Sequence, residues 1–321
     1  MEYRRLGRTA LRVSPLCLGT MNFGPQTEEP DSHAIMDRAL ELGINFFDTA
    51  NRYGGSLGAG GTEEIIGRWF ALGGGRRDKV VLATKAFGPM SDWPNDGGLS
   101  ARHIRHACDE SLRRLQTDHI DLYQMHHIDR SAPWDEVWQA MELLVAQGKV
   151  IYVGSSNFAG WQIADADWTS RTNQWARMVS AQNSYSLVDR RVENEVIPAC
   201  RRFGVGMLPF FPLASGLLTG KYKRGEEGPE GSRLGKGSPM AAGASRFLND
   251  RNFDKVEALE KVAAEAGVSL LHLAMGGLAA QPAVASVIAG ATSPEQIKAN
   301  VAAGTWTPPA DVLAAIDEAT K

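Results

Sequence analysis

The chain of 321 residues is 43% apolar and 22% charged, which is typical of a folded protein long enough to bury a sizeable core. Its 34 basic and 37 acidic side chains give a net charge of −3, and no Lys/Arg-rich run is present that would neutralise phosphates, so we expect no nucleic-acid partner. The three cysteines are widely spaced and odd in number, which indicates neither a disulfide framework nor a zinc site.

The amino terminus and one apolar stretch indicate the cellular compartment of the protein. Residues 1–8 are polar where a secretory signal peptide has its apolar segment, so together with the cysteines they predict a cytoplasmic protein. Residues 268–291 carry no formal charge and are about long enough to span a bilayer, but a pair of glycines and Gln281-Pro282 interrupt them. We predict a buried helix up to Ala280, then a strand over residues 284–289, and no membrane contact.

Short β-branched or apolar runs alternate along the chain with longer helical patterns, which is typical of a parallel sheet covered by helices. Helices are predicted over residues 31–42, over residues 100–115 with Ser100 as the N-cap, and over residues 134–147. Several of the strand-like runs are nearly continuous in apolar residues, as expected for strands covered on both faces. The eight predicted strands are residues 14–19, 45–49, 80–84, 120–125, 151–155, 179–182, 206–210 and 285–288.

Eight strand-helix units in a chain of this length predict a (β/α)8 TIM barrel over residues 1–321 as a single domain. A Rossmann fold is less favoured because the first strand is not followed by a Gly-x-Gly-x-x-Gly turn. Residues 3–6 and 11–13 are expected to form a β-hairpin that plugs the bottom of the barrel. Residues 222–252, rich in Gly, Arg and Lys, are expected to form a long loop after strand 7, as a lid, a binding segment or a disordered insertion.

Polar side chains follow three successive predicted strands at their carboxyl ends, where barrel enzymes carry their active sites. Asp48 and Tyr53 follow the second strand, Lys85 the third and His126 the fourth. Taken singly, Asp48, Tyr53 and His126 each have an ordinary structural explanation as a turn, packing or hydrogen-bonded residue. Lys85 is harder to explain in this way, because the residues before it are apolar or small and place it in a buried strand. A buried ammonium needs a partner, most naturally Asp48. Their co-occurrence on adjacent strand ends favours a catalytic site.

The chemistry that this set supports is proton donation to a carbonyl that receives a hydride. The pKa of a tyrosine is about 10, and a neighbouring ammonium favours the phenolate, so we expect Lys85 to lower the pKa of Tyr53. Asp48 would hold Lys85 in place, and His126 would donate a hydrogen bond to the carbonyl oxygen. No side chain here supplies a hydride, so a nicotinamide cofactor is required.

These residues resemble the motifs of the aldo-keto reductase superfamily, and the resemblance extends over nearly the whole chain. The resemblance implies a (β/α)8 barrel that binds NADPH without a Rossmann domain. It also implies that Tyr53 is the general acid/base, with Asp48, Lys85 and His126 as its partners. The matching segments are residues 43–50, 53–54, 84–85 and 121–126, in that order.

The later strand ends resemble the family's cofactor-binding segments. Ser156, Asn157 and Gln182 match the residues that hydrogen-bond the nicotinamide carboxamide, which suits amide and hydroxyl groups. Phe210 stands where the family has an aromatic ring that stacks on the nicotinamide, whereas Phe211 replaces a usually small residue. The implied cofactor site comprises Gly19, Thr20, Met21, Asp48, Ser156, Asn157, Gln182, Phe210, Leu213, Ser215, Leu217, Lys221, Gly290, Gln296 and Asn300.

The resemblance divides the rest of that site between the two halves of the cofactor. Lys221 and the loop backbone around it are implied to bind the pyrophosphate, and Asn300 the adenine. Gln296 stands where many members have an arginine against the 2'-phosphate. NADPH is therefore the expected cofactor, with NADH use left open.

Two other functions fit parts of the sequence. The first is a binding or regulatory protein on the same scaffold, like the potassium channel β subunits of this family, although the complete set of four polar residues favours activity. The second is a metal enzyme based on His103 and His106 or on His126 and His127, which is disfavoured because no carboxylate or cysteine converges on them; we expect no metal. Residues 95–100 and 126–134 resemble both reductases of nucleotide-linked keto-deoxysugars and general carbonyl reductases, so a small carbonyl compound, sugar-derived ones included, is the expected substrate.

Overall fold

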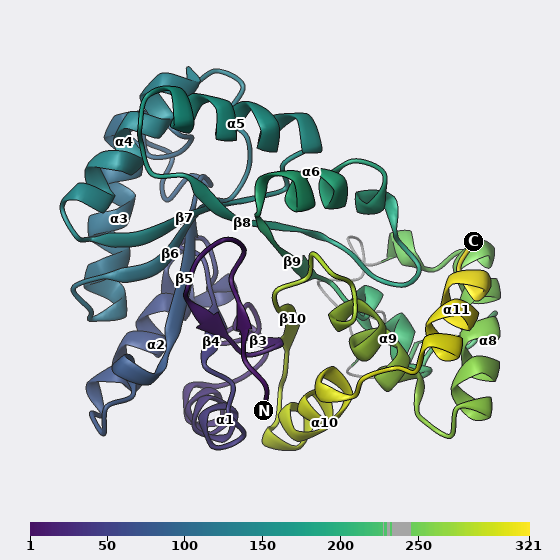
Figure 1. Cartoon of the computed structure of the whole chain (residues 1–321). Coiled ribbons are helices and arrows are strands. Elements are labelled where there is room, and N and C mark those ends of the chain that lie inside the picture. Colours follow the sequence, from purple (N-terminus) through teal and green to yellow (C-terminus); the bar gives the residue numbers. More distant parts are fainter. Residues whose placement is uncertain (227, 230–231, 233–244) are drawn as a thin grey trace.

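The computed structural model describes residues 1–226, 228–229, 232 and 245–321, and Figure 1 shows their arrangement. Among these residues, eight parallel strands pair in the order β10-β3-β4-β5-β6-β7-β8-β9. The ring closes between β9 and the segment before β10, where Met207 N donates to Ala283 O at 2.8 Å and Ala285 N donates to Met207 O at 3.0 Å. The strands are β3 (Leu16–Gly19), β4 (Phe46–Asp48), β5 (Val81–Ala86), β6 (Ile120–Met125), β7 (Val150–Ser156), β8 (Met178–Ser184), β9 (Gly206–Phe210) and β10 (Val287–Gly290).

Helices surround this ring, so the predicted (β/α)8 TIM barrel is confirmed (Figure 1). The predicted N-cap of α3 is present, with the Ser100 hydroxyl accepting from His103 N at 3.2 Å. Gly43 and Gly148 end α1 and α4 in the left-handed region, with φ of 87° and 72°. The helices are α1 (Glu29–Glu41), α2 (Gly61–Ala71), α3 (Ala101–Leu115), α4 (Trp134–Ala146), α5 (Gly160–Thr172), α6 (Val196–Phe203), α8 (Asp250–Glu265), α9 (Leu270–Ala279), α10 (Pro294–Thr305) and α11 (Ala310–Ala319).

The predicted hairpin closes one end of the barrel. Strands β1 (Arg4–Arg5) and β2 (Arg12–Val13) pair antiparallel, and in Figure 1 the hairpin lies in front of the barrel strands. Its fully buried Leu6 and Val13 belong to the cluster of apolar side chains that fills the barrel interior. A second and larger cluster fills the space between the sheet and the helices. The catalytic groups expected at the opposite end therefore stand on a filled and rigid base.

The prediction of a long loop over residues 222–252 is wrong at the carboxyl end of that range. Ser245–Phe247 forms a short 3-10 helix, η5, and α8 begins at Asp250. Asn249 caps that helix, since its side-chain oxygen accepts a hydrogen bond from Asn252 N at 3.0 Å. The negative charge of Asp250 in the first turn interacts favourably with the positive end of the helix dipole. The part of the prediction on residues 227, 230–231 and 233–244 lies outside the described residues.

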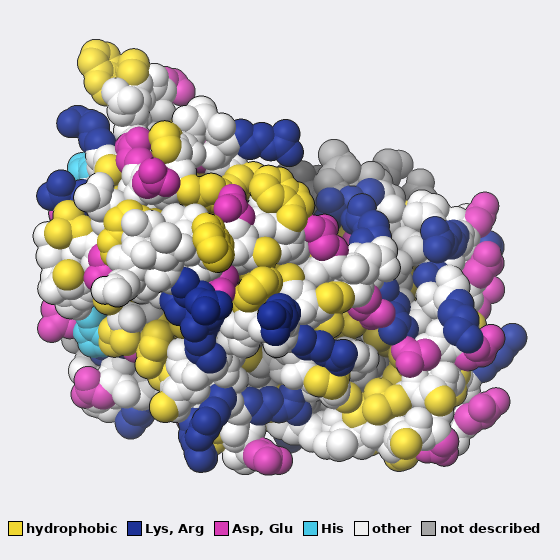
Figure 2. Space-filling model, turned by 45° about the horizontal axis from the view of Figure 1, so that its top comes forward, with side chains coloured by type: hydrophobic (Ala, Val, Ile, Leu, Met, Phe, Trp, Pro, Cys, Tyr) yellow, Lys and Arg dark blue, Asp and Glu magenta, His cyan; other side chains and the backbone are white. Residues whose placement is uncertain are grey.

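The apolar stretch at residues 268–291 divides as predicted into the buried helix α9 and the strand β10, although β10 begins two residues later than residues 285–288 indicated. No single helix of the described ranges is long and apolar enough to cross a bilayer, while α8 and α9 together, bent by 94°, satisfy the same test of length and composition. On the face that Figure 2 shows, Lys and Arg side chains lie in several groups with Asp and Glu side chains between them, in keeping with the small net charge of −3.

Candidate active site

The buried Lys85 ammonium is at the centre of the polar groups at the carboxyl ends of the strands. Asp48 is the last residue of β4, and Lys85 lies in β5; their side chains are 4% and 0% exposed. Lys85 Nζ donates to Asp48 Oδ2 at 2.6 Å and to Thr49 O at 2.8 Å, and lies 3.4 Å from Tyr53 Oη. The pairing of Lys85 with Asp48 that the sequence predicts is therefore present, and Tyr53 joins it.

Electrostatics sets the protonation of this group. Burial on its own lowers the pKa of Lys85, but the Asp48 carboxylate, the hydrogen bonds to Asp48 and Tyr53, and the Tyr53 phenolate once that group ionises outweigh it, so the pKa of Lys85 is raised and the ammonium stays charged at neutral pH. For Tyr53, burial raises the pKa and the Lys85 ammonium offsets only part of that rise. Lys85 thus lowers the pKa of Tyr53 as expected, but burial together with the Asp48 carboxylate raises it by more, so the pKa of Tyr53 lies above its ordinary value. Tyr53 keeps its proton at neutral pH and can donate it.

His126 follows β6 and faces Tyr53, with ring centroids 6.0 Å apart and the planes at 81°. Its other neighbour is His127, stacked at 5.1 Å with the rings 14° apart. Burial, the Lys85 ammonium and His127 lower the pKa of His126 to about 3. His126 is therefore a neutral imidazole at physiological pH, which can donate a hydrogen bond from one nitrogen without carrying charge.

Two glutamines bind the remaining oxygen of Asp48. Gln182 Nε2 donates to Asp48 Oδ1 at 2.8 Å, and Gln124 Nε2 donates to the same atom at 3.2 Å. Gln124 is fully buried, and sequence reasoning missed it. The available signal was the strand period of two, which places Leu122, Gln124 and His126 on the face that points into the barrel.

The residues expected to hold a carboxamide lie together beside Asp48. Ser156 ends β7, and Asn157 follows it with φ of 62°. Asn157 Nδ2 donates to Ser156 Oγ at 3.0 Å and to His126 O at 3.0 Å. With Gln182 on the adjacent strand, these side chains offer hydroxyl and amide groups without net charge, which is the donor and acceptor set that a neutral carboxamide requires.

The expected residues of β3 and β9 complete the rim. Thr20 is buried, and its hydroxyl donates to Asp48 O at 2.9 Å, with Met21 directly after it. Gly19 pairs in register with Gly290, and a Cβ at position 19 would lie 2.9 Å from Ile288 Cγ2. Phe210 ends β9 half-buried. A glycine at position 19 therefore keeps the ends of β3 and β10 close together.

The segment after β9 contains Leu213, Ser215, Leu217 and Lys221 and has an unusual backbone. Within the 3-10 helix η4 (Ala214–Thr219), Ser215 has φ of 60° and Gly216 has φ of 98°. A Cβ at position 216 would lie 2.9 Å from Lys221 Cε, so the missing side chain lets Lys221 pack against the loop. The Lys221 ammonium stays exposed, 5.2 Å from the centre of the Tyr222 ring.

Phe211, which departs from the resemblance, takes a φ of 53°. Its ring packs edge-on against Phe210 at 5.2 Å and against Phe247 of η5 at 6.4 Å. The Arg246 guanidinium lies over both the Phe211 ring and the Phe247 ring, at 5.7 Å and 4.8 Å. The aromatic side chain at position 211 therefore ties the segment after β9 to η5.

The residues expected at the adenosine end lie on α10. Asn300 Nδ2 donates to Gly290 O at 3.4 Å. Gln296 is exposed, and its side-chain oxygen accepts from Thr292 N at 3.0 Å and from Thr292 Oγ1 at 3.3 Å. The oxygen of Gln296 is thus occupied by its own loop, which leaves the amide NH2 as the end that can meet a phosphate.

Two basic residues of the predicted loop, Lys223 and Arg224, are bound to α8. Lys223 Nζ contacts Glu260 at 3.0 Å. Arg224 contacts Asp254 at 2.6 Å and Asp250 at 3.1 Å. These two cations are therefore engaged away from Gln296, while Arg233 and Lys236 lie outside the described residues.

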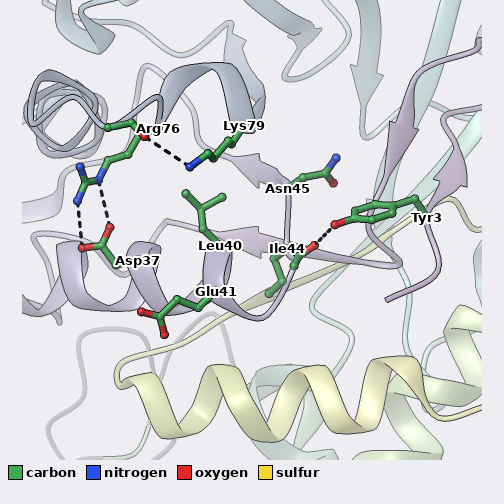
Figure 3. A pocket seen from close by; sticks show the side chains of 10 residues that line it. Tyr3, Asp37, Leu40, Glu41, Ile44, Asn45, Arg76 and Lys79 are labelled. Atoms are coloured by element: carbon green, nitrogen blue, oxygen red, sulfur yellow. Dashed lines mark hydrogen bonds and ion pairs between the residues drawn. The ribbon is translucent and has the colours of Figure 1, made fainter.

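Other candidate sites are less suited to chemistry. The described ranges contain no group of three or more His, Cys, Asp or Glu side chains that could hold a metal ion. A cavity of about 740 Å³ lies at the amino ends of β4 and β5 (Figure 3), and none of Asp48, Tyr53, Lys85 and His126 lines it. Its polar groups bind one another, with Arg76 Nε 3.1 Å from Asp37 Oδ1 and Tyr3 Oη 3.0 Å from Gly43 O.

Comparison with known proteins identifies the chain's relatives. Residues 15–321 match the model of the Aldo/keto reductase family. The chain belongs to this family. Like the members that carry an oxidoreductase description, this aldo/keto reductase is an oxidoreductase enzyme.

Relatives of this aldo/keto reductase are described in several ways. It is 47% identical over 308 residues to the uncharacterized oxidoreductase YrpG of Bacillus subtilis, covering 94% of this chain and 91% of that protein. It is 37% identical over 305 residues to a probable voltage-gated potassium channel subunit beta of Oryza sativa, covering 94% and 91%. It is 33% identical over 327 residues to the L-glyceraldehyde 3-phosphate reductase of Escherichia coli O157:H7, covering 99% and 92%.

Proposed function

We propose that this enzyme reduces aldehydes or ketones to alcohols with NADPH, with Tyr53 as the general acid. The observation that carries the proposal is the buried Lys85 ammonium, 2.6 Å from Asp48 Oδ2 and 3.4 Å from Tyr53 Oη. A charged lysine beside a protonated tyrosine is the arrangement that releases a phenolic proton and stabilises the phenolate left behind. The nicotinamide, when bound, supplies the hydride.

The chain's own groups then have separate tasks. Tyr53 Oη gives its proton to the carbonyl oxygen as negative charge develops there, and the Lys85 ammonium stabilises the resulting phenolate. Asp48 keeps Lys85 charged and in place. His126, neutral because its pKa is lowered to about 3, donates a hydrogen bond to the same carbonyl oxygen and orients the substrate.

The residues present suit a nicotinamide dinucleotide. Ser156, Asn157 and Gln182 would hold the carboxamide, and Phe210 would stack on the ring. The loop backbone at Leu213, Ser215 and Leu217 would bind the pyrophosphate together with Lys221, and Gly19, Thr20, Met21 and Gly290 would line the same cofactor site. Asn300 would contact the adenine. Gln296 can hydrogen-bond a 2'-phosphate without neutralising it, so NADH is a second cofactor in this proposal.

Sugar-derived carbonyl compounds are the proposed substrate class. The relative from Escherichia coli that is named for a phosphorylated three-carbon aldehyde supports including such compounds. Within this chain the exposed Arg52 directly precedes Tyr53, and its Cγ and Cδ lie 3.3 Å from where a Cβ of Gly88 would be. An exposed arginine one residue before the proposed acid suits a substrate with a phosphate or carboxylate.

The experiment is a screen of aldehydes, ketones and phosphorylated sugar aldehydes with NADPH and NADH in parallel. We expect cofactor oxidation that depends on the carbonyl compound. The channel-subunit relatives support one other candidate, a regulatory protein that uses a bound cofactor as a redox sensor. Tight NADPH binding without turnover of any carbonyl compound would favour that candidate and contradict the reductase.

A further inference from the structure

Asp48 is bound on both of its oxygens. Oδ2 accepts the charged hydrogen bond from Lys85, while Oδ1 accepts two amide hydrogen bonds, from Gln182 at 2.8 Å and from Gln124 at 3.2 Å. A buried carboxylate needs such donors, because each one replaces a hydrogen bond to water. The two glutamines hold the orientation of Asp48 and therefore the position of the Lys85 ammonium.

The two glutamines are not equivalent. In the proposed function Gln182 also serves the carboxamide of the cofactor, so its amide is shared between two partners. Gln124 is fully buried inside the barrel, on β6, and has no such second partner. When Gln182 turns toward a carboxamide, Gln124 is the donor that remains on Asp48.

Gln124 leaves one buried polar atom unpaired. Within the described residues its side-chain oxygen has no hydrogen-bond partner. An unpaired buried acceptor destabilises a fold, and an apolar side chain in its place would remove it. The Asp48 carboxylate fixes the amide orientation, since a flipped amide would set oxygen against oxygen. A buried group that weakens the fold is the kind of residue that a functional site retains.

The barrel makes room for this side chain at Gly154 of the neighbouring strand. A Cβ at position 154 would lie 3.1 Å from Gln124 Cγ and 2.2 Å from Ser180 Oγ. Only a residue without a side chain fits there. Gly154 and Gln124 therefore belong to one arrangement that brings an amide under Asp48.

We propose that Gln124 is a positioning residue that keeps Asp48 and Lys85 in their working geometry while Gln182 binds the cofactor. The proposal rests on the proposed function, since it acts through the Asp48, Lys85 and Tyr53 group. It adds a residue on β6 to that group. It also separates two effects that can be measured independently, the stability of the fold and the geometry of the active site.

The first test is Gln124→Leu, with Ser180→Ala as the matched control. Ser180 is buried in the same part of the barrel, and its hydroxyl has no partner within the described residues. We expect Gln124→Leu to lower kcat about tenfold, to raise the Kd for NADPH measured by tryptophan fluorescence, and to leave the melting temperature of the cofactor-free protein at or above that of the wild type. Ser180→Ala should change none of these.

The second test is Gln124→Glu, which turns the proposed role into a pH dependence. A protonated glutamic acid can donate to Asp48, whereas an ionised one repels it. Burial and the neighbouring Asp48 carboxylate raise the pKa of this carboxyl above its ordinary value of about 4.3, and the Lys85 ammonium on the adjacent strand, already paired with Asp48, offsets only part of that rise. The activity of the variant should therefore fall as pH rises from about 5 to 8, where the wild type changes little.

Two results would overturn the proposal. The first is that Gln124→Leu has the same kcat and Kd as Ser180→Ala. The second is that the melting temperature of Gln124→Leu falls together with its activity, while Gln124→Glu keeps the pH profile of the wild type. If the wild-type protein binds NADPH but reduces no carbonyl compound, the proposed function fails instead. The Kd and melting measurements then still test the role of Gln124.

Discussion

The polar cluster around Arg77 at the amino ends of the strands and the one around Asp48 at their carboxyl ends differ in how completely their groups are hydrogen-bonded. At the amino ends of the strands, Arg77 has a partner for each arm of its guanidinium: Nε donates to Thr117 Oγ1 at 2.8 Å, Nη1 to Val80 O at 2.8 Å, and Nη2 to His119 O at 2.9 Å and Asp121 Oδ2 at 2.8 Å. That carboxylate also accepts from the backbone N of Leu82 at 2.9 Å. Each arm of the Arg77 guanidinium and the Asp121 carboxylate are therefore hydrogen-bonded.

At the carboxyl ends, groups remain unsatisfied or are held away from their ordinary protonation state. Both amide atoms of the buried Asn51 and the oxygen of Gln124 lack partners within the described residues. His126 has its pKa lowered to about 3, and Tyr53 has its pKa raised. The difference between these two clusters teaches that the Arg77 group is built from matched partners that stabilise the fold, whereas the group around Asp48 and Tyr53 includes side chains that are costly to the fold and suited to chemistry.

The largest effect should follow from Tyr53→Phe, which removes one oxygen from the open end. Only the phenolic proton donor is lost, so kcat should fall by about a thousandfold while the Kd for NADPH changes little. Steady-state kinetics and fluorescence titration measure the two quantities. A variant that keeps near wild-type kcat would mean that Tyr53 is not the acid.

Lys85→Met should reduce kcat by about a hundredfold and change the pH profile. The ammonium lowers the pKa of Tyr53, so its removal raises that pKa further, and the alkaline limb of the profile should move to higher pH. An active variant with the wild-type limb would contradict this coupling.

Lys85 should also make the wild-type stability depend on alkaline pH. Its pKa is raised in the folded protein, so its contribution to the free energy of unfolding is fully present below the unfolded pKa of about 10.4 and is lost as pH rises through the folded value. Denaturant unfolding between neutral and alkaline pH measures this. In Lys85→Met the loss attributable to this group should be absent.

Arg77→Met tests the other end of the comparison. Its loss leaves Asp121 partly buried without its charged partner, so we expect the free energy of unfolding to fall by about 2 kcal/mol with kcat within twofold of the wild type. Urea unfolding and a standard turnover assay decide it. A large fall in kcat in a folded variant would show that the two ends are coupled rather than separate.

Gln296→Arg should have the smallest effect. A charge-assisted hydrogen bond to phosphate is about twice as strong as a neutral one, so the ratio of kcat/KM for NADPH to that for NADH should rise, by up to about tenfold. Both cofactors are measured in both proteins. An unmoved ratio would mean that position 296 does not face the 2'-phosphate.

The sequence predicted the architecture because the barrel repeats one signal. Each strand is a short apolar run and several of the described helices are followed closely by a glycine, so strand number, order and the hairpin could be read without contacts. Asp48 and Lys85 were predicted as partners because an isolated lysine in an apolar run needs a countercharge. That inference needs only the types of the two residues and the fact that they end neighbouring strands, and a sequence shows both.

The features that could not be predicted depend on contacts and burial in the folded protein. The raised pKa of Tyr53 reflects desolvation outweighing one nearby cation, and neither size is visible in a sequence. Gln124 is an ordinary residue in its strand, and only the closed ring brings its amide to Asp48. The start of α8 within the predicted loop depends on Asn249, whose capping role was hidden among Gly, Arg and Lys.

The most direct test of the account is the fate of a labelled hydride. NADPH deuterated at C4 of the nicotinamide is supplied with an aldehyde that the wild-type enzyme turns over, and the product is examined by mass spectrometry and NMR. The account predicts an alcohol with deuterium on the former carbonyl carbon, and almost none from Tyr53→Phe under the same conditions. An alcohol without that deuterium, or equal product from Tyr53→Phe, would contradict it.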